Sequence, residues 1–264
     1  MKDCPICFGE LSKAFTATVL QKYEVSYYHC KTCGFVRSER PYWLDEAYSA
    51  AIAKTDTGLV SRNLALAKKL AILLYCYYPN DAAFLDYAGG YGLLTRLMRD
   101  NGFNFFWDDK FCQNLLASGF EADTAKQRFQ AVTGFEVIEH VHDPVSFVKD
   151  VLEKSGCRTF IFSTQLYSGE IPPAPDWWYY AFDEGQHIAF FQFKTLAKLA
   201  EKLGLKFYSK NGIHILTDRK LQHSGIALLW AMKLSAVISP IIKWRLGSLT
   251  MIDHGKLMHD KHAE

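Results

Sequence analysis

The stretch that most constrains the fold is an apolar run that ends near an acid and is followed by a glycine-rich turn. The run is Ala83-Phe84-Leu85-Asp86-Tyr87, the turn is Ala88-Gly89-Gly90-Tyr91-Gly92, and leucines at helical spacing follow. This order predicts a strand, a tight turn and a helix, which is how the nucleotide-type sites of α/β proteins begin. The alternative is a glycine-rich turn that holds no ligand.

The composition of the chain narrows the classes of partner. The 264 residues are 49% apolar and 22% charged, with a net charge of +2, which indicates one or two globular domains. So small a net charge argues against binding mainly through phosphate electrostatics, and nucleic acid is not the expected partner. The first residues, Met-Lys-Asp-Cys-Pro, contain no apolar signal segment, which favours a cytoplasmic location.

Four cysteines form two matched pairs near the N-terminus. They are Cys4, Cys7, Cys30 and Cys33, and 22 residues separate the two C-x-x-C turns. Four thiolates make the closed tetrahedral set that structural zinc prefers. We therefore expect a zinc ribbon over residues 1–40, with a hairpin in the β-prone stretch 19–28 and zinc supplying much of its stability. The alternative is a pair of redox dithiols.

A second acid stands where a βαβ nucleotide site would place one. Asp108 follows the β-prone run 103–107 and comes 22 residues after Asp86. An acid about 20 residues beyond a glycine turn ends the second strand and accepts hydrogen bonds from ribose hydroxyls. Asp109 is a rival for this role.

The segment from Ala131 to Pro144 carries the most specific motif of the chain. It contains Glu136-Val-Ile-Glu139-His140-Val-His-Asp143-Pro144. With the glycine turn, it resembles the class I S-adenosylmethionine (SAM) methyltransferases, and in particular the branch of the ubiquinone-pathway O-methyltransferases. The family's usual first glycine is Ala88 here. The resemblance covers roughly residues 83–217 and implies a set of cofactor-binding residues: Asp86, Ala88, Gly90, Gly92, Asp108 and Glu136.

The alternation of strands and helices predicts an α/β fold. We expect a Rossmann-like, seven-stranded, mostly parallel sheet with helices on both faces over residues 41–217. Asp143 is expected to cap a helix that starts at Pro144. Asn211-Gly212 is a hairpin turn signal between the last two strands.

The second half of the motif holds the candidate catalytic groups. Glu139, His140 and a distant His187 are the residues that we expect to serve the reaction. Small-RNA 2′-O-methyltransferases have a similar Glu-x-x-Glu-His set with a further histidine, and this resemblance implies a second divalent ion at Glu136, Glu139, His140 and His187. Two alternatives need no metal: a histidine is the general base, or Glu139 and His140 only orient the loop.

Two later segments bear on the partners of the protein. Residues 171–193 are rich in proline and aromatic residues, and they form either an acceptor pocket or an apolar plug against the zinc module. Residues 218–264 are expected to be a helical appendage. Its apolar stretch contains Lys233 and Pro240 and is a poor transmembrane candidate. Trp244 beside Lys243 and Arg245 suits peripheral contact with a membrane surface, and a lid or a homodimer contact through these helices is the alternative.

Together these features predict a SAM-dependent methyltransferase that acts on oxygen or carbon of a small-molecule or sugar acceptor. The N-terminal cysteines also resemble those of bacterial deoxysugar C-methyltransferases. Two alternatives stay open. One is an RNA methyltransferase whose zinc ribbon recognises its substrate, and the other is a SAM-binding protein without catalysis.

Overall fold

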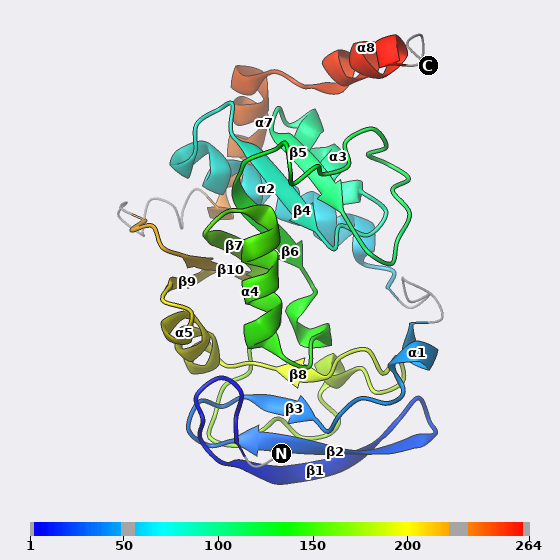
Figure 1. The fold of residues 1–264 in the computed structure, drawn as a ribbon, viewed down its shortest axis with the longest axis vertical. Helices are drawn as coiled ribbons and strands as arrows, with labels where there is room; N and C mark the ends of the chain where they lie inside the picture. Colours follow the sequence, from blue (N-terminus) through cyan, green and yellow to red (C-terminus); the bar gives the residue numbers. More distant parts are fainter. Residues whose placement is uncertain (1–2, 49–55, 222–231, 261–264) are drawn as a thin grey trace. The chain divides into compact units, whose positions relative to one another are not determined.

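The structure is a computed structural model that describes residues 3–48, 56–221 and 232–260. The chain divides into two compact units, and Figure 1 labels their helices and strands. The first unit comprises Met1–Ala53, Gly134–Glu153 and Arg158–Arg219, and the second comprises Lys54–Thr133, Lys154–Cys157 and Lys220–Glu264. The domain limits expected after residues 40 and 217 stay predictions.

Parallel strands form the centre of the second unit. Strand β4 (Ala83–Tyr87) pairs in parallel with β5 (Asn104–Asp108) on one side and with β6 (Phe129–Phe135) on the other. Helix α2 (Leu59–Tyr77) precedes β4, and α3 (Leu93–Asp100) connects β4 to β5. Because parallel neighbours need a crossover, this alternation gives the α/β arrangement that the sequence predicts.

The sheet contains six strands in the described residues, in the order β5-β4-β6-β7-β10-β9. Beside β5, only a one-residue parallel bridge joins Trp107 to Glu121. Two backbone hydrogen bonds hold it, from Trp107 N to Phe120 O and from Ala122 N to Trp107 O, both of 2.8 Å. The segment 109–128 is turn-rich, and we find there a single bridge where a seventh strand would pair.

The first unit contains the remaining strands of this sheet. Strand β10 (Ile213–Thr217) is antiparallel to both β7 (Thr159–Ser163) and β9 (Lys206–Lys210). The predicted hairpin at Asn211-Gly212 is confirmed, and both residues have positive φ. Asp143 accepts hydrogen bonds from the backbone N–H groups of Val145 and Ser146, both of 3.1 Å, and α4 (Pro144–Ser155) begins as predicted.

The N-terminal segment forms a second sheet within the first unit. Strands β1 (Leu11–Val19) and β2 (Tyr23–Cys30) form a hairpin as expected, but it begins at Leu11 rather than within the predicted stretch 19–28, and β3 (Val36–Ser38) follows. Strand β3 also pairs with β8 (Ala189–Phe190), which lies 150 residues later in the chain. The order β1-β2-β3-β8 therefore makes the cysteine module and the aromatic segment one sheet.

The aromatic segment forms a core with this sheet. Short helix η2 (Trp178–Tyr180) places Tyr179 and Tyr180 in it, and Trp43 after β3 is also fully buried. Several ring pairs stack or meet edge to edge there, as between Tyr180 and Phe182 at 5.0 Å. Most rings of this segment pack against the ribbon, which favours the apolar plug over the acceptor pocket. Trp178 and Ile171 remain exposed.

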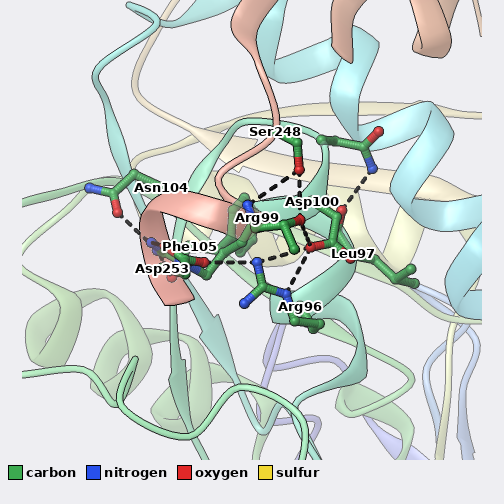
Figure 2. A network of polar contacts seen from close by, with 10 residues as sticks. Arg96, Leu97, Arg99, Asp100, Asn104, Phe105, Ser248 and Asp253 are labelled. Carbon is green, nitrogen blue, oxygen red and sulfur yellow. Dashed lines mark hydrogen bonds and ion pairs between the residues drawn. The ribbon is translucent and has the colours of Figure 1, made fainter. Parts of the chain in front are cut away.

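The C-terminal appendage of the second unit contains α7 (Ser235–Leu246) and α8 (Thr250–Asp260). Figure 2 shows how α8 is attached to α3 through the buried carboxylate of Asp253. Arg99 donates to both oxygens of Asp253 at 2.6 and 2.8 Å, and Arg96 donates to one at 2.8 Å. The guanidinium of Arg99 also lies 3.7 Å from the centre of the Phe120 ring.

This ion-pair network fixes the position of the appendage. Burial alone would raise the pKa of Asp253, but the hydrogen bonds from Arg99 and Arg96 outweigh it and lower the pKa below its ordinary value. The appendage therefore packs on the helix that follows the glycine turn. None of the described helices is both long and apolar enough to cross a membrane. Part of the predicted apolar stretch, residues 222–231, lies outside the described residues.

Candidate functional site

The four N-terminal thiols come together as the sequence predicts. The distances are 3.7 Å between the sulfurs of Cys4 and Cys33 and 3.5 Å between those of Cys7 and Cys30, and all four sulfurs lie within 4.8 Å of one another. Tetrahedral zinc with bonds of about 2.3 Å places its sulfurs about 3.8 Å apart. The donor set therefore fits a structural zinc ion.

The second cysteine turn is held by the segment that carries β8. Tyr167 donates to the carbonyl of Gly34, and Thr195 Oγ1 donates to the carbonyl of Cys33 at 2.6 Å. A Cβ on Gly34, whose φ is +74°, would lie 2.3 Å from the side chain of Gln192. The ion site and residues 167–195 are thus packed together within the first unit.

The glycine turn of the second unit is built to leave its backbone open. Gly90 has a φ of +56°, and a Cβ there would meet no atom within 4 Å. Its N–H donates to Asp109 Oδ2 at 2.9 Å, and its carbonyl accepts from Trp107 Nε1 at 2.8 Å. The side chains of Asp109 and Trp107 therefore hold the backbone of the turn. The space beside the Cα of Gly90 is open, and a β-carbon would fill it.

The other small residues of the turn differ from Gly90. Gly92 has a φ of +85°, and a Cβ there would lie 2.6 Å from Asn114 Oδ1. Ala88, the departure from the family pattern, has a φ of +54°, a region that costs an L-residue about 1–2 kcal/mol. The alanine thus adopts the conformation that a glycine would adopt more readily.

Asp86 lies beneath this turn, almost fully buried. Thr95 donates to its Oδ2 at 3.0 Å, and Thr133 donates to its Oδ1 at 2.9 Å. Burial raises the pKa of Asp86 to about 6, although the two threonine bonds act in the opposite direction. A Cβ on Gly89 would come within 2.9 Å of this carboxylate. The geometry makes Asp86 a support of the turn, and its role toward the cofactor stays a prediction.

The two candidate ribose acids occupy the end of β5 and the turn that follows. Asp108 Oδ2 accepts from Lys154 Nζ at 2.7 Å. Asp109 accepts from the backbone N–H groups of Gly90, Phe111 and Cys112. Because backbone donors occupy Asp109 on both oxygens, its carboxylate shapes the turn, and Asp108 remains the predicted ribose acid.

Glu136 has a strained backbone at the end of β6. Its φ is +54°, and residues held in this region cluster at functional sites. Ser163, the last residue of β7, holds it twice: the Oγ atom accepts from Glu136 N at 3.1 Å and donates to Glu136 Oε1. The side chain is therefore held between the ends of β6 and β7.

A carboxylate and two imidazoles form a second candidate metal group in the first unit. The ligand atoms of Glu139, His140 and His187 all lie within 4.8 Å of one another. Glu139 and His140 belong to the short helix η1 (Ile138–His140). Glu139 is fully buried, and its Oε2 atom has no hydrogen-bond partner among the described residues. An orphaned buried carboxylate oxygen beside two imidazoles fits a divalent cation. Glu136 is not part of this closest group, and its place among the ligands stays a prediction.

Hydrogen bonds orient the members of this group. Tyr179 OH donates to Glu139 Oε1 at 2.8 Å, and His187 Nδ1 lies 2.7 Å from the backbone carbonyl of Tyr179. That carbonyl accepts only, so His187 Nδ1 carries the proton and Nε2 keeps a free lone pair. His140 Nδ1 bonds to Tyr48 OH at 2.8 Å. Sequence reasoning missed Tyr48 and Tyr179 because nothing in the pattern connects them to the motif.

The environment decides which protonation states these groups have. Burial, followed by the charge of Glu136, raises the pKa of Glu139 to about 8. Burial, followed by repulsion from His187, lowers the pKa of His140 to about 3. Burial also lowers the pKa of His187. Near pH 7 both imidazoles are therefore neutral, which is the form that accepts a proton or binds a metal.

Comparisons with solved structures find methyltransferases. Similar chains include magnesium protoporphyrin IX methyltransferase from Synechocystis PCC 6803 with bound SAH (13% identity, 66% of this chain and 90% of that chain covered, TM-score 0.42). Two others are the mitomycin 7-O-methyltransferase MmcR (13%, 67% and 60%, 0.43) and the plantazolicin methyltransferase BpumL in complex with SAH (7%, 66% and 93%, 0.43). A search of curated proteins finds no match.

The family follows from the sequence itself. The family model described as a methyltransferase domain matches residues 60–210, which is more than half of the chain. The match includes the glycine turn, Asp108, Glu136 and the group around Glu139. The chain belongs to this methyltransferase-domain family and is a SAM-dependent methyltransferase of class I.

Proposed function

We propose that the protein transfers the methyl group of SAM to a hydroxyl oxygen or a carbon of a small-molecule or sugar acceptor, with the group of Glu139, His140 and His187 serving the acceptor. The observation that carries this proposal is the orphaned Oε2 atom of Glu139 beside two neutral imidazoles. These are groups that hold a cation or take a proton.

The glycine turn supports the cofactor part of the proposal. The open side of Gly90 is the surface onto which a nucleoside would fit, since a β-carbon there would occupy the space. Asp86, Ala88, Gly92, Asp108 and Glu136 complete the proposed cofactor set. SAM supplies a methyl group on a positively charged sulfur, and the chain's task is to align the acceptor with it.

The proton balance of transfer to oxygen assigns a role to the buried group. The bond from sulfur to the methyl carbon breaks as the bond from oxygen to that carbon forms, and the hydroxyl loses its proton. His187, with Nδ1 fixed by the carbonyl of Tyr179, offers Nε2 to take that proton. A divalent ion on Glu139, His140 and His187 would instead lower the pKa of the acceptor hydroxyl.

The four-thiol site is proposed to hold structural zinc rather than to take part in the reaction. Its second turn is held by Thr195 and Tyr167, and β3 pairs with β8 just after His187. A zinc ion held there would therefore stabilise the segment that positions the catalytic group. This role needs no nucleic-acid contact.

The test is methyl transfer from labelled SAM to a panel of hydroxylated small molecules and nucleotide sugars, measured by mass spectrometry. We expect His187→Ala to abolish transfer and to leave SAM binding unchanged. His254→Ala, an exposed histidine on α8, is the matched control and retains full activity. Equal activity of both variants would remove the buried group from the reaction.

A second measurement distinguishes the metal from the general base. Binding of Mn²⁺ alone, followed by electron paramagnetic resonance, is expected in the unaltered protein and lost in Glu139→Gln. Tyr179→Phe keeps all three ligands and removes the hydroxyl that donates to Glu139 and also bonds to Thr164 Oγ1 and Gln165 N, so it should weaken binding less. Absence of Mn²⁺ binding with activity that is unaffected by chelators assigns the group to base catalysis.

A further inference from the structure

The C-terminal appendage has an unusual distribution of charge. Residues 219–252 contain no aspartate or glutamate, in a chain with 28 acidic residues, yet they contain five basic ones. The basic residues are Arg219, Lys220, Lys233, Lys243 and Arg245. The charged side chains of this segment are therefore all basic.

Helix α7 exposes an apolar stripe within this segment. Leu234, Val237, Ile241 and Trp244 are 52%, 64%, 53% and 82% exposed. Their spacing of three, four and three residues places them on one face of a helix. The opposite face is the one that packs, because Ser239 and Ile242 are buried. The apolar side chains of the stripe are therefore not those that pack α7 against the rest of its unit.

Basic side chains accompany the stripe, and α7 as the structure describes it contains no acid. Lys243 and Arg245 are exposed on α7, and Lys233 is exposed just before the helix begins. On the neighbouring helix, Met251 and Ile252 are also exposed, whereas the acid that follows them, Asp253, is buried and paired with Arg96 and Arg99. The ion pairs thus neutralise the carboxylate nearest to the apolar side chains.

We propose that the stripe Leu234-Val237-Ile241-Trp244 binds an anionic lipid surface, with α7 lying in the plane of the interface. Lysine and arginine extend toward headgroups while apolar side chains enter the acyl boundary, and tryptophan is favoured at that depth. A protein interface would instead exclude lysine from its centre. Helix α7 is too short to span a bilayer, so it lies on the surface.

This inference does not rest on the proposed reaction. It places the methyltransferase at a membrane, where an acceptor that is apolar or lipid-linked would be found. Attachment through the second unit leaves α8 bound to α3 through Asp253, so binding requires no rearrangement of the described residues.

The test is co-sedimentation of the full chain with vesicles of phosphatidylcholine alone or mixed with phosphatidylserine. We expect binding to the mixed vesicles that weakens with salt, and little binding to the neutral ones. Ile241→Ser combined with Trp244→Ser should reduce partitioning by at least about tenfold. Lys243→Glu should reduce it by about tenfold, whereas Lys243→Arg should not change it.

The control is Val60→Ser, which removes an apolar residue that is 56% exposed on α2 and should leave partitioning unchanged. Circular dichroism verifies that each variant is folded. Wild-type binding by the Ile241/Trp244 variant would overturn the proposal, as would the absence of binding to mixed vesicles. A dimer that Ile241→Ser dissociates, without any lipid binding, would assign the stripe to a second copy instead.

Discussion

The substitution Gly90→Ala tests whether the glycine turn is a binding surface. Gly90 has a φ of +56° and nothing within 4 Å of the position of a Cβ, so the added methyl group clashes with no protein atom. The cost to the fold is the left-handed backbone alone, about 1–2 kcal/mol. In a protein of this size that lowers the melting temperature by roughly 2–8 °C.

The expected effect on SAM binding is larger than the effect on the fold. A methyl group placed in a close-fitting contact typically costs about 1–3 kcal/mol, or roughly ten- to hundredfold in affinity. The matched control is Gly156→Ala, because Gly156 has a φ of +64° and also has nothing within 4 Å. Both variants should lose similar stability, and only Gly90→Ala should lose affinity.

Isothermal titration with SAM and thermal unfolding of the two variants give the required comparison. Equal SAM affinity of Gly90→Ala and Gly156→Ala would show that the ligand does not approach this turn. A much larger loss of stability for Gly90→Ala would show that its surroundings are occupied by protein, against the geometry.

Three further predictions concern the ions and the buried charges. Removing zinc, by a chelator or by Cys33→Ser, should lower the melting temperature and abolish activity, because the thiol site supports β8 and His187. Elemental analysis should find a single zinc per chain. A melting temperature that does not change when the metal is removed would contradict the structural role of zinc. For Glu139, the pKa in the folded state is about 8 against 4.5 for the ordinary group, so the folded state binds the extra proton and the contribution of Glu139 to stability should fall as pH rises between these values, by up to about 1.4 kcal/mol per pH unit. His140, whose pKa is lowered from 6.5 to about 3, acts in the opposite direction below pH 6.5, so the decline is measured between pH 6.5 and 8. Glu139→Gln should remove this decline in denaturant titrations of metal-free protein, and a persisting slope would refute it. Asp253→Ala should cost about 3–5 kcal/mol because it leaves the guanidinium of Arg99 buried without a carboxylate partner. Asp100→Ala breaks a partly exposed pair with Arg96 and one exposed hydrogen bond from Thr250, and it should cost about 1 kcal/mol. Similar losses would show that Asp253 is not the residue that holds α8 in the network of Figure 2.

The sequence predicts those parts of the fold that local chemistry specifies. The C-x-x-C turns, the glycine turn, the cap at Asp143 and the hairpin at Asn211-Gly212 each need particular residues at particular positions. The structure places all of them as expected. The group of Glu139, His140 and His187 was predicted through a family resemblance, and the structure brings their ligand atoms together.

Features that depend on distant contacts were not predictable from the sequence. The pairing of β3 with β8 and the bond from Tyr48 to His140 join segments far apart in the chain. Whether the aromatic segment forms a pocket or a plug depends on the pairing of β3 with β8, because this pairing turns the aromatic rings toward the ribbon. Likewise, Asp253 has no signature in the sequence, because its partners on α3 are identified only when α8 packs there.

The central claim is that this chain binds SAM at its glycine turn and transfers the methyl group. Calorimetric titration of the purified protein with SAM and with SAH tests it most directly. We expect one-to-one binding of both nucleosides, weakened in Gly90→Ala and unchanged in Gly156→Ala. Absence of heat with either nucleoside, confirmed by an unchanged melting temperature at saturating SAM, would contradict it.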